Sequence, residues 1–336
     1  MITLRPTSTH ASTWQMQLRE AYRDIRLLLA ELGLDPADPA LALGDGAGFP
    51  VLVPRSFASR MRPGDPYDPL LRQVLPVRAE GEPWPGFGLD PVGDGAARAA
   101  TGVIHKYQGR ALLISTGSCA IHCRYCFRRH FPYAAETAAS AQWADALRYL
   151  RAHPEVEEVL LSGGDPLSLA THKLAQLSEG LVGLPTLRRL RIHTRWPVVL
   201  PARVDAPLLK WLGTLPWAVV MVLHVNHARE LDCPSVHAAL LALRRAGVSL
   251  LNQAVLLRGI NDSAAAQLEL SRSLGDLGVM PYYLHLLDRV EGAGHFEVSE
   301  HEGRELIDTL RRELPGYLVP RLARESAGAP SKHVLA

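Results

Sequence analysis

The chain has 336 residues, of which 47% are hydrophobic and 21% are charged, as expected for a folded globular protein. The 36 lysines and arginines nearly balance the 34 acidic residues, so the net charge is only +2. This charge gives no electrostatic reason to expect binding to nucleic acid or to an anionic membrane. No segment has the ~18 consecutive apolar residues of a membrane span. Met1–Glu20 is polar and lacks the apolar core of a signal peptide, so we expect a cytoplasmic protein.

Residues 1–100 predict a helical, loop-rich cap. Apolar residues at helical spacing predict one helix over Thr13–Leu32, which Gly33 or Pro36 would end. Proline and glycine are dense from Pro36 to Gly95, a composition that is typical of turns and loops. We therefore interpret this region as a cap on another domain and not as an enzyme domain of its own.

Residues 101–314 alternate between strand-like and helix-like patterns. Strands are expected over Ala111–Ser115, Glu157–Ser162, Leu187–Thr194, Ala218–His224, Val248–Leu257 and Val279–Leu286. Helices are expected over Ala139–Ala152, Thr171–Val182, Ala206–Gly213, Ser235–Ala246, Ala264–Leu277 and Ser299–Glu313. Such alternation predicts parallel strands with crossover helices, and six units are too few for a closed eight-fold barrel. The expected fold class is α/β, a partial (β/α)6 TIM-like barrel, with an open doubly wound sheet as the alternative.

Three of the four cysteines lie close together directly after the first predicted strand. The segment Cys119-Ala-Ile-His-Cys123-Arg-Tyr-Cys126, here called the cysteine loop, has the spacing C-x3-C-x2-C. Thiolates are soft ligands that suit iron–sulfur clusters and zinc. Three thiolates can hold three corners of a [4Fe-4S] cluster and leave the fourth iron open to a small molecule. Cys233 is the only other cysteine and hence the only possible fourth thiolate.

Zinc is the alternative occupant of the cysteine loop. His122 or His130 could complete a Cys3His set. Structural zinc sites, however, usually draw their ligands from two well-separated pairs, and this loop does not have that spacing.

Other polar clusters follow the predicted strands at the same expected edge of the sheet. They are Gly163-Gly164-Asp165, Arg195-Trp196-Pro197, His224-Val225-Asn226-His227, Arg258-Gly259-Ile260-Asn261 and Asp288-Arg289. In barrel enzymes the reactive residues lie on loops after the carboxyl ends of the strands. We therefore expect the active site at this edge.

The motifs resemble a known enzyme family. The cysteine spacing, with Tyr125 before the last cysteine, is similar to that of the radical S-adenosylmethionine enzymes. Four segments together resemble the lysine 2,3-aminomutase family: Cys126-Phe-Arg-Arg-His-Phe-Pro-Tyr133, Ser162-Gly-Gly-Asp-Pro-Leu167, Pro197-Val-Val-Leu-Pro201 and Asn252-Gln-Ala-Val-Leu-Leu-Arg-Gly-Ile-Asn-Asp262. The resemblance extends from about residue 95 to residue 336. Length and an end soon after Pro330-Ser-Lys332 are similar to a short bacterial branch, which supplies β-lysine for the modification of elongation factor P.

The resemblance implies three cofactors. Cys119, Cys123 and Cys126 match the ligands of a [4Fe-4S] cluster, whose open iron binds S-adenosylmethionine. The residues near S-adenosylmethionine would be Tyr125, Gly163, Gly164, His224 and Asn226. Pyridoxal 5′-phosphate would bind to the tail 315–336, where Lys332 matches the Schiff-base lysine, with Lys106 and Arg110 near the phosphate. The only other lysines, Lys173 and Lys210, fall in helical patterns and are expected in solvent.

The resemblance also implies L-lysine as the substrate and (R)-β-lysine as the product. Arg128 matches the arginine that binds the α-carboxylate, and Asp288 matches one of two acids that bind the ε-ammonium. Glu325 stands where the other acid is an aspartate. Expected partners are a one-electron donor such as flavodoxin or ferredoxin, and elongation factor P with its lysyl-transferring ligase. The alternatives are an aminomutase for another amino acid such as glutamate, a non-catalytic iron–sulfur redox sensor, and a zinc-stabilised binding module.

Overall fold

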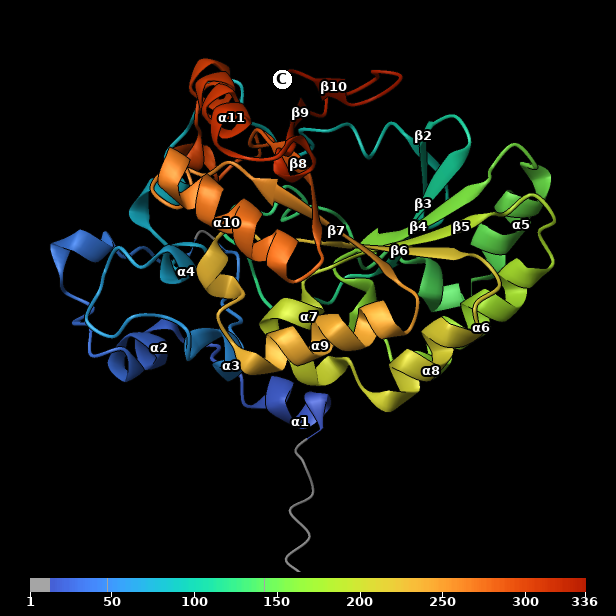
Figure 1. Ribbon diagram of the computed structural model, residues 1–336, viewed down its shortest axis with the longest axis horizontal. Coiled ribbons are helices and arrows are strands. Elements are labelled where there is room, and N and C mark those ends of the chain that lie inside the picture. Colours follow the sequence, from blue (N-terminus) through green and yellow to red (C-terminus); the bar gives the residue numbers. More distant parts are fainter. Residues whose placement is uncertain (1–12, 47, 142) are drawn as a thin grey trace, which may run out of the picture.

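The computed structural model describes residues 13–46, 48–141 and 143–336, and a curved sheet lies at its centre (Figure 1). The ten strands of the described residues form one sheet and follow one another in chain order. They are β1 (Arg98–Ala100), β2 (Val103–Tyr107), β3 (Arg110–Thr116), β4 (Glu158–Gly163), β5 (Arg189–Thr194), β6 (Ala218–Leu223), β7 (Ser249–Val255), β8 (Met280–His285), β9 (Arg321–Arg324) and β10 (His333–Val334). The expectation for residues 1–12 lies outside the described residues.

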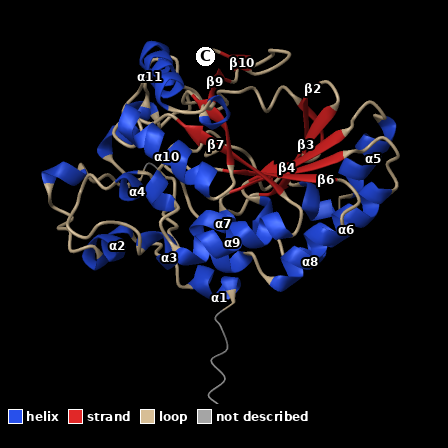
Figure 2. Cartoon of the chain, viewed as in Figure 1, coloured by secondary structure: helices blue, strands red, loops and turns tan. Residues whose placement is uncertain are grey.

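The strands β3 to β9 are parallel, and their order identifies a partial barrel. A doubly wound sheet reverses its strand order at one point, whereas this sheet never does. Right-handed crossovers that all advance in one direction place the helices on one face, as Figure 2 shows. The six predicted strands are confirmed as β3–β8, and the doubly wound alternative is wrong.

The predicted crossover helices are also confirmed, with small shifts at their ends. The helices after β3 are α5 (Ala144–Ala152), α6 (Thr171–Val182), α7 (Trp196–Val199), α8 (Ala206–Thr214), α9 (Pro234–Arg245), α10 (Ala264–Asp276) and α11 (Glu300–Glu313). The expected helix from Ala139 begins instead as a short 3-10 turn, Ala138–Ala141, ahead of α5. Among the described residues, no helix combines the length and apolar character needed to cross a bilayer.

Two hairpins extend the sheet at its edges, and the sequence patterns did not predict them. The strands β1 and β2 pair antiparallel with each other, and β2 pairs antiparallel with β3. At the other edge β9 joins β8 in parallel and β10 folds back on β9. These strands are too short for a recognisable alternation, since β10 has only two residues.

The N-terminal helices are shorter than expected. The structure has α1 (Trp14–Arg19), α2 (Ile25–Glu31), α3 (Arg55–Ala58) and α4 (Pro69–Arg72), so a single helix over Thr13–Leu32 is wrong. The chain is extended at Tyr22, which pairs with Val53 in an antiparallel bridge. Asp24 then caps α2 by accepting a hydrogen bond from the Arg26 backbone N–H at 2.8 Å.

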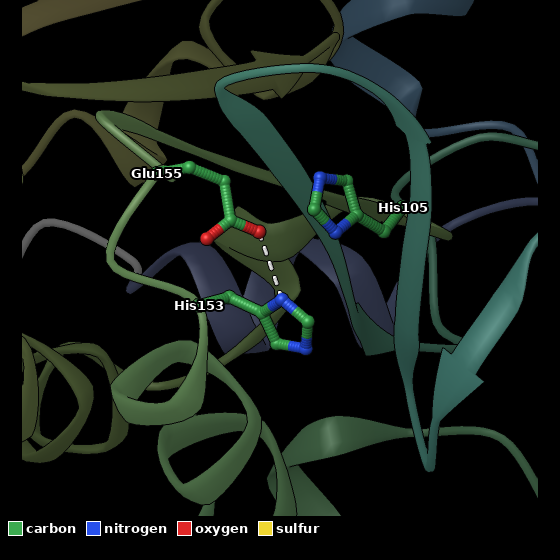
Figure 3. Close-up of side chains that lie close together, drawn as sticks. All are labelled: His105, His153 and Glu155. Atoms are coloured by element: carbon green, nitrogen blue, oxygen red, sulfur yellow. Dashed lines mark hydrogen bonds and ion pairs between the residues drawn. The ribbon is translucent and has the colours of Figure 1, made fainter.

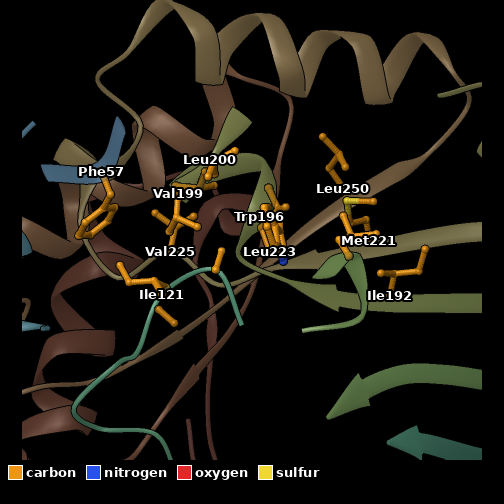
Figure 4. Close-up of a cluster of buried hydrophobic side chains, with 14 of the residues drawn as sticks. Phe57, Ile121, Ile192, Trp196, Val199, Leu200, Met221, Leu223, Val225 and Leu250 are labelled. Atoms are coloured by element: carbon orange, nitrogen blue, oxygen red, sulfur yellow. The ribbon is translucent and has the colours of Figure 1, made fainter. Parts of the chain in front are cut away.

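The cap and the barrel share one hydrophobic core. Figure 4 shows Phe57 of α3, Ile121 of the cysteine loop and Trp196 of α7 in the same buried cluster as strand residues such as Leu223. Phe57 and Trp196 are completely buried. The cap therefore packs directly against the loop that carries the cysteines.

Candidate active site

A cavity of about 430 Å³ lies at the carboxyl ends of the parallel strands. All fourteen residues that the resemblance assigns to the cofactors or the substrate line it. They are Cys119, Cys123, Cys126, Tyr125, Gly163, Gly164, His224, Asn226, Lys106, Arg110, Arg128, Asp288, Glu325 and Lys332. The fold thus brings residues from both ends of the chain to one place.

The cap holds the cysteine loop through a buried ion pair. The Arg124 guanidinium is fully buried and donates to the Glu80 carboxylate, with an Nε–Oε1 distance of 2.7 Å. It also donates to the backbone carbonyls of Gly46 at 2.9 Å and Phe49 at 2.8 Å. The Arg124 backbone N–H donates to the carbonyl of Gln73 at 2.9 Å. Because Arg124 lies between two of the cysteines, these contacts fix the loop.

One compact group of potential metal ligands lies outside the cysteine loop. In the described residues, the one group of three potential ligands with all ligand atoms within 4.8 Å of one another is His105, His153 and Glu155, where β2 meets the end of α5 (Figure 3). His122 and His130 bond to backbone carbonyls and do not line the cavity.

A buried arginine contacts the cysteine loop. One nitrogen of Arg195, Nη1, lies 2.7 Å from Cys123 Sγ and 2.7 Å from the Tyr125 hydroxyl. The other, Nη2, donates to Glu230 at 2.6 Å and to Gln73 at 3.1 Å. Burial alone would lower the pKa of Arg195, but the charges of Cys123, Tyr125 and Glu230 raise it well above the ordinary value. Arg195 is therefore a permanent cation beside the cysteine loop.

The glycine pair after β4 is required by the protein's own backbone. Gly163 has φ of +121°, and a Cβ atom there would lie 2.6 Å from the carbonyl oxygen of Thr116. A Cβ atom on Gly164 would lie 2.5 Å from the carbonyl oxygen of Ser118. Both positions therefore need glycine so that β4 can pack closely against the start of the cysteine loop.

Three histidines with buried ring nitrogens leave hydrogen-bonding capacity in the cavity wall. The Nε2 atoms of His193, His224 and His285 have no hydrogen-bond partner among the residues that the structure describes. Burial, with Arg195 and Arg128 nearby, lowers the pKa of His224 to about 3, and burial also lowers those of His193 and His285. Neutral imidazoles with a free ring nitrogen are suited to bind a polar ligand.

The side chain of Asn226, by contrast, is saturated. Its amide nitrogen donates to the Tyr125 hydroxyl at 2.6 Å and to Gln73 at 3.0 Å, and its oxygen accepts from the Val255 backbone at 2.9 Å. Asn226 therefore holds Tyr125 and the end of β7 in place.

A chain of alternating charges forms the other end of the cavity. Lys332 Nζ lies 2.6 Å from Glu325 Oε2, and Lys106 Nζ lies 2.9 Å from Glu325 Oε1. Lys106 also contacts Asp94 at 2.7 Å, and Asp94 accepts a hydrogen bond from Arg128 Nε at 2.7 Å. The β9–β10 hairpin brings Glu325 and Lys332 together, since they follow β9 and precede β10. Glu325, expected to bind substrate, is thus already paired with two lysines.

Burial and these charges shift the pKa values of Asp288 and Glu325 in opposite directions. Burial raises the pKa of Asp288 to about 7, because Lys332 opposes the shift only in part. For Glu325, burial alone would raise the pKa, but Lys332 and Lys106 outweigh it and lower the pKa to about 2. At neutral pH Glu325 is therefore an anion, while Asp288 is close to its midpoint.

Comparison with known proteins identifies the family. The chain is 47% identical to the L-lysine 2,3-aminomutase of Escherichia coli, over 95% of this chain and 93% of that protein. It is 43% identical to the Haemophilus influenzae enzyme of the same name, over 98% of both chains. The chain belongs to the lysine 2,3-aminomutase family.

More distant family members match over less of their own length. The L-lysine 2,3-aminomutase of Clostridium subterminale is 32% identical, over 95% of this chain and 76% of that protein. Among solved structures, a radical SAM methyltransferase from Sphaerobacter thermophilus aligns with a TM-score of 0.48 and 18% identity, over 66% of this chain and 68% of that chain. No protein-family model matches the chain.

Within this family member, the remaining cysteine and lysines lie away from the cavity lining. Cys233 Sγ lies 3.1 Å from Ser235 Oγ at the start of α9, and Cys233 does not line the cavity. Lys173 on α6 and Lys210 on α8 are exposed, as predicted. Lys106 and Lys332 are the two lysines that line the cavity.

Several site residues were missed from the sequence. Arg195 lies in one of the predicted strand-end loops, so its position was predicted but no role was. Asp94 and Gln73 come from the proline- and glycine-rich cap, whose pattern gave no sign of contact with the site. Glu230 lies in a short 3-10 helix, Ala228–Glu230, that no periodicity indicated.

Proposed function

We propose that this protein is an L-lysine 2,3-aminomutase that uses a [4Fe-4S] cluster, S-adenosylmethionine and pyridoxal 5′-phosphate to form (R)-β-lysine. The observation that carries the proposal is the single cavity lined by the cysteine loop at one end and by Lys332 at the other. The names of the relatives support the reaction and the substrate.

The residues present suit each of the three groups. The thiolates of Cys119, Cys123 and Cys126 are soft ligands on one fixed loop, which suits an iron–sulfur cluster. The buried, unpaired Nε2 atoms of His193, His224 and His285 support a polar ligand, S-adenosylmethionine, beside it. Lys332 offers an amine for covalent attachment of pyridoxal phosphate, and Lys106 and Arg110 offer positive charge for a phosphate. When bound, these groups would supply an electron, a carbon radical and an electron-accepting carbonyl.

The ion pairs of the site support lysine as the substrate. Arg128 has a planar fork of donors that suits the α-carboxylate, and it now donates to Asp94 and to the Ser162 hydroxyl. Asp288 and Glu325 suit the ε-ammonium.

A glutamate aminomutase is the weaker alternative. The side-chain carboxylate of glutamate would meet Glu325, which is anionic at neutral pH, and Asp288, which is partly ionised. Like charges at this distance repel, and a cavity that excludes water strengthens the repulsion.

We further propose that the product serves elongation factor P through its lysyl-transferring ligase, and that flavodoxin or ferredoxin supplies the electron. The share of each relative that the match covers supports membership of the short branch of the family. The match spans 93% and 98% of the E. coli and H. influenzae proteins but 76% of the clostridial one. The near-neutral charge and the absence of a spanning helix among the described residues give no support for nucleic-acid or membrane partners.

The test is anaerobic turnover. Protein reconstituted with iron, sulfide and pyridoxal phosphate is mixed with reductant, S-adenosylmethionine and L-lysine, and β-lysine is resolved by chiral mass spectrometry. We expect (R)-β-lysine, lost in Cys123→Ala and Lys332→Ala. Formation of 5′-deoxyadenosine with β-glutamate from glutamate, but no β-lysine from lysine, would favour the glutamate alternative. An iron–sulfur protein that cleaves no S-adenosylmethionine would instead be a redox sensor.

A further inference from the structure

We propose that Arg195 is a positioning residue that raises the reduction potential of the cluster, and that Glu230 opposes it. This inference rests on the proposed iron–sulfur function. It concerns a residue that contacts a cysteine sulfur without being a ligand itself, and it assigns opposite effects to the two members of one buried ion pair.

The guanidinium of Arg195 is held in one orientation toward the cysteine loop. Arg195 is 5% exposed, and its backbone N–H donates to Asp165 Oδ2 at 2.7 Å. The side chain reaches across the cavity to Cys123 Sγ and Tyr125 from one nitrogen and to Glu230 and Gln73 from the other. With both terminal nitrogens engaged, the charge cannot turn away from the sulfur without breaking several buried hydrogen bonds.

Glu230 is the acid that fixes this orientation, and it is itself fixed. It is completely buried, and its Oε1 accepts from the backbone N–H groups of Asn226 at 2.9 Å and His227 at 3.1 Å and from Gln73 Nε2 at 3.0 Å. Its Oε2 is left for Arg195. A buried pair of this kind is a costly way to stabilise a fold, since apolar side chains can often replace it without loss. The contact with Cys123 gives the pair a role beyond stability.

The physical effect has a definite sign. Reduction adds one electron, delivered by an external one-electron donor, so the cluster and its thiolates become more negative by one charge. An N–H···S hydrogen bond and a nearby fixed cation both stabilise the more negative state, and cluster potentials respond to such contacts. Arg195 should therefore make the cluster easier to reduce, and the Glu230 carboxylate should make it harder.

The experiment is a redox titration of the anaerobically reconstituted holoenzyme, followed by the electron paramagnetic resonance signal of the reduced cluster in the absence of S-adenosylmethionine. The variants are Arg195→Gln, Arg195→Lys, Glu230→Gln and the double variant Arg195→Gln/Glu230→Gln. We expect a lower midpoint potential in Arg195→Gln and a higher one in Glu230→Gln. The double variant and Arg195→Lys should each lie between Arg195→Gln and the wild type.

A matched control is available in the same cavity. Arg191 also lines the cavity but pairs with Glu158, with an Nε–Oε1 distance of 3.0 Å, and it has no contact with a cysteine. Arg191→Gln should leave the midpoint potential unchanged. If Arg195→Gln does not fold, the double variant and Glu230→Gln still test the proposal, because a merely structural pair would not shift the potential upward when its acid is removed.

Two results would overturn the inference. The first is a set of variants with full iron content and the wild-type potential. The second is an unchanged midpoint potential together with a larger dissociation constant for S-adenosylmethionine. That result would make Arg195 a ligand-binding residue. Failure of the cofactor assignment is distinguishable, because the wild-type protein would then show no [4Fe-4S] signal at all.

Discussion

The two ends of the cavity are built on different principles. At the cysteine end, Arg124 of the cysteine loop pairs with Glu80 of the cap, and both side chains are 0% exposed. At the lysine end, Lys332 and Glu325 are 23% and 17% exposed and lie on a hairpin at the sheet edge. Breaking a buried pair leaves an uncompensated charge, whereas a partly solvated pair is readily exchanged. The difference suits a permanent group at one end and an exchanging substrate at the other.

The largest expected effect is that of Lys332→Ala, which should remove function at the lysine end and leave the cysteine end intact. Lys332→Ala should abolish the visible absorbance of bound pyridoxal phosphate and all β-lysine formation, because no other cavity lysine except Lys106 is available and Lys106 pairs with Asp94 and Glu325. Iron and sulfide content should remain at the wild-type level. Lys210→Ala, on the exposed face of α8, is the control and should keep the absorbance. Loss of iron in Lys332→Ala would show that the two ends are not independent.

The buried anchor of the cysteine end should dominate stability. Arg124→Gln leaves the Glu80 charge with only Arg129 as a partner, and such a change typically costs about 3–5 kcal/mol. Denaturant unfolding of the cofactor-free protein measures it. The surface pair of Arg304 with Glu300, 46% and 34% exposed, is the control, and Arg304→Gln should cost less than about 1 kcal/mol. An equal loss of unfolding free energy in Arg124→Gln and Arg304→Gln would contradict the proposed difference between the buried and the exposed ion pair.

Substrate binding should be more sensitive to geometry than to charge. Arg128→Lys keeps the positive charge but loses the planar fork, and hydrogen bonds to charged groups are worth about 1.5–3 kcal/mol. We expect kcat/KM for lysine to fall about 10- to 100-fold, with unchanged iron and pyridoxal phosphate content. Arg98→Lys, in a half-exposed pair with Glu136, is the control. An Arg128→Lys variant with wild-type kcat/KM would exclude Arg128 from carboxylate binding.

The smallest expected effect is a pH dependence at the lysine end. The pKa of Asp288 is raised to about 7, so the carboxyl is protonated below that pH and anionic above it. Because kcat/KM reports the free enzyme, its value for lysine should rise a few-fold as pH increases through 7. Asp288→Asn should flatten this rise. Glu325→Gln should keep it, since the pKa of Glu325 is lowered to about 2 and Glu325 does not titrate in this range.

Asp288 should also give stability the opposite pH dependence. An acid whose pKa is raised on folding stabilises the folded state fully below its unfolded pKa, near 4, and loses that contribution as pH rises through its folded pKa. The cofactor-free protein should thus lose stability between about pH 4 and pH 7. In Asp288→Asn, the melting temperature should depend less on pH across that interval than in the wild type. An unchanged pH dependence would contradict the assignment.

The barrel was predictable because its signals are local. The strands β3–β8 are short runs that are apolar or that alternate apolar with polar residues, and the following helices have apolar residues at helical spacing, so pattern alone located them within a few residues. The break at Tyr22 was not predictable, because it depends on pairing with Val53 in another segment. The hairpin of β9 and β10 was not predictable for the same reason, because its strands form only through pairing with β8 and with each other.

The sequence by itself determined the chemical inventory: three thiolates on one loop, four lysines, and polar clusters after each predicted strand. Only the tertiary structure decided which of these groups meet. It paired Glu325 with Lys332 and Lys106, turned Arg195 toward Cys123, and brought Asp94 from the cap to the cavity and Gln73 to Arg195. The physical reason is that ligand-forming residue types and their local spacing are written along the chain. Ion pairs and buried hydrogen bonds, by contrast, depend on distances between segments that only packing sets.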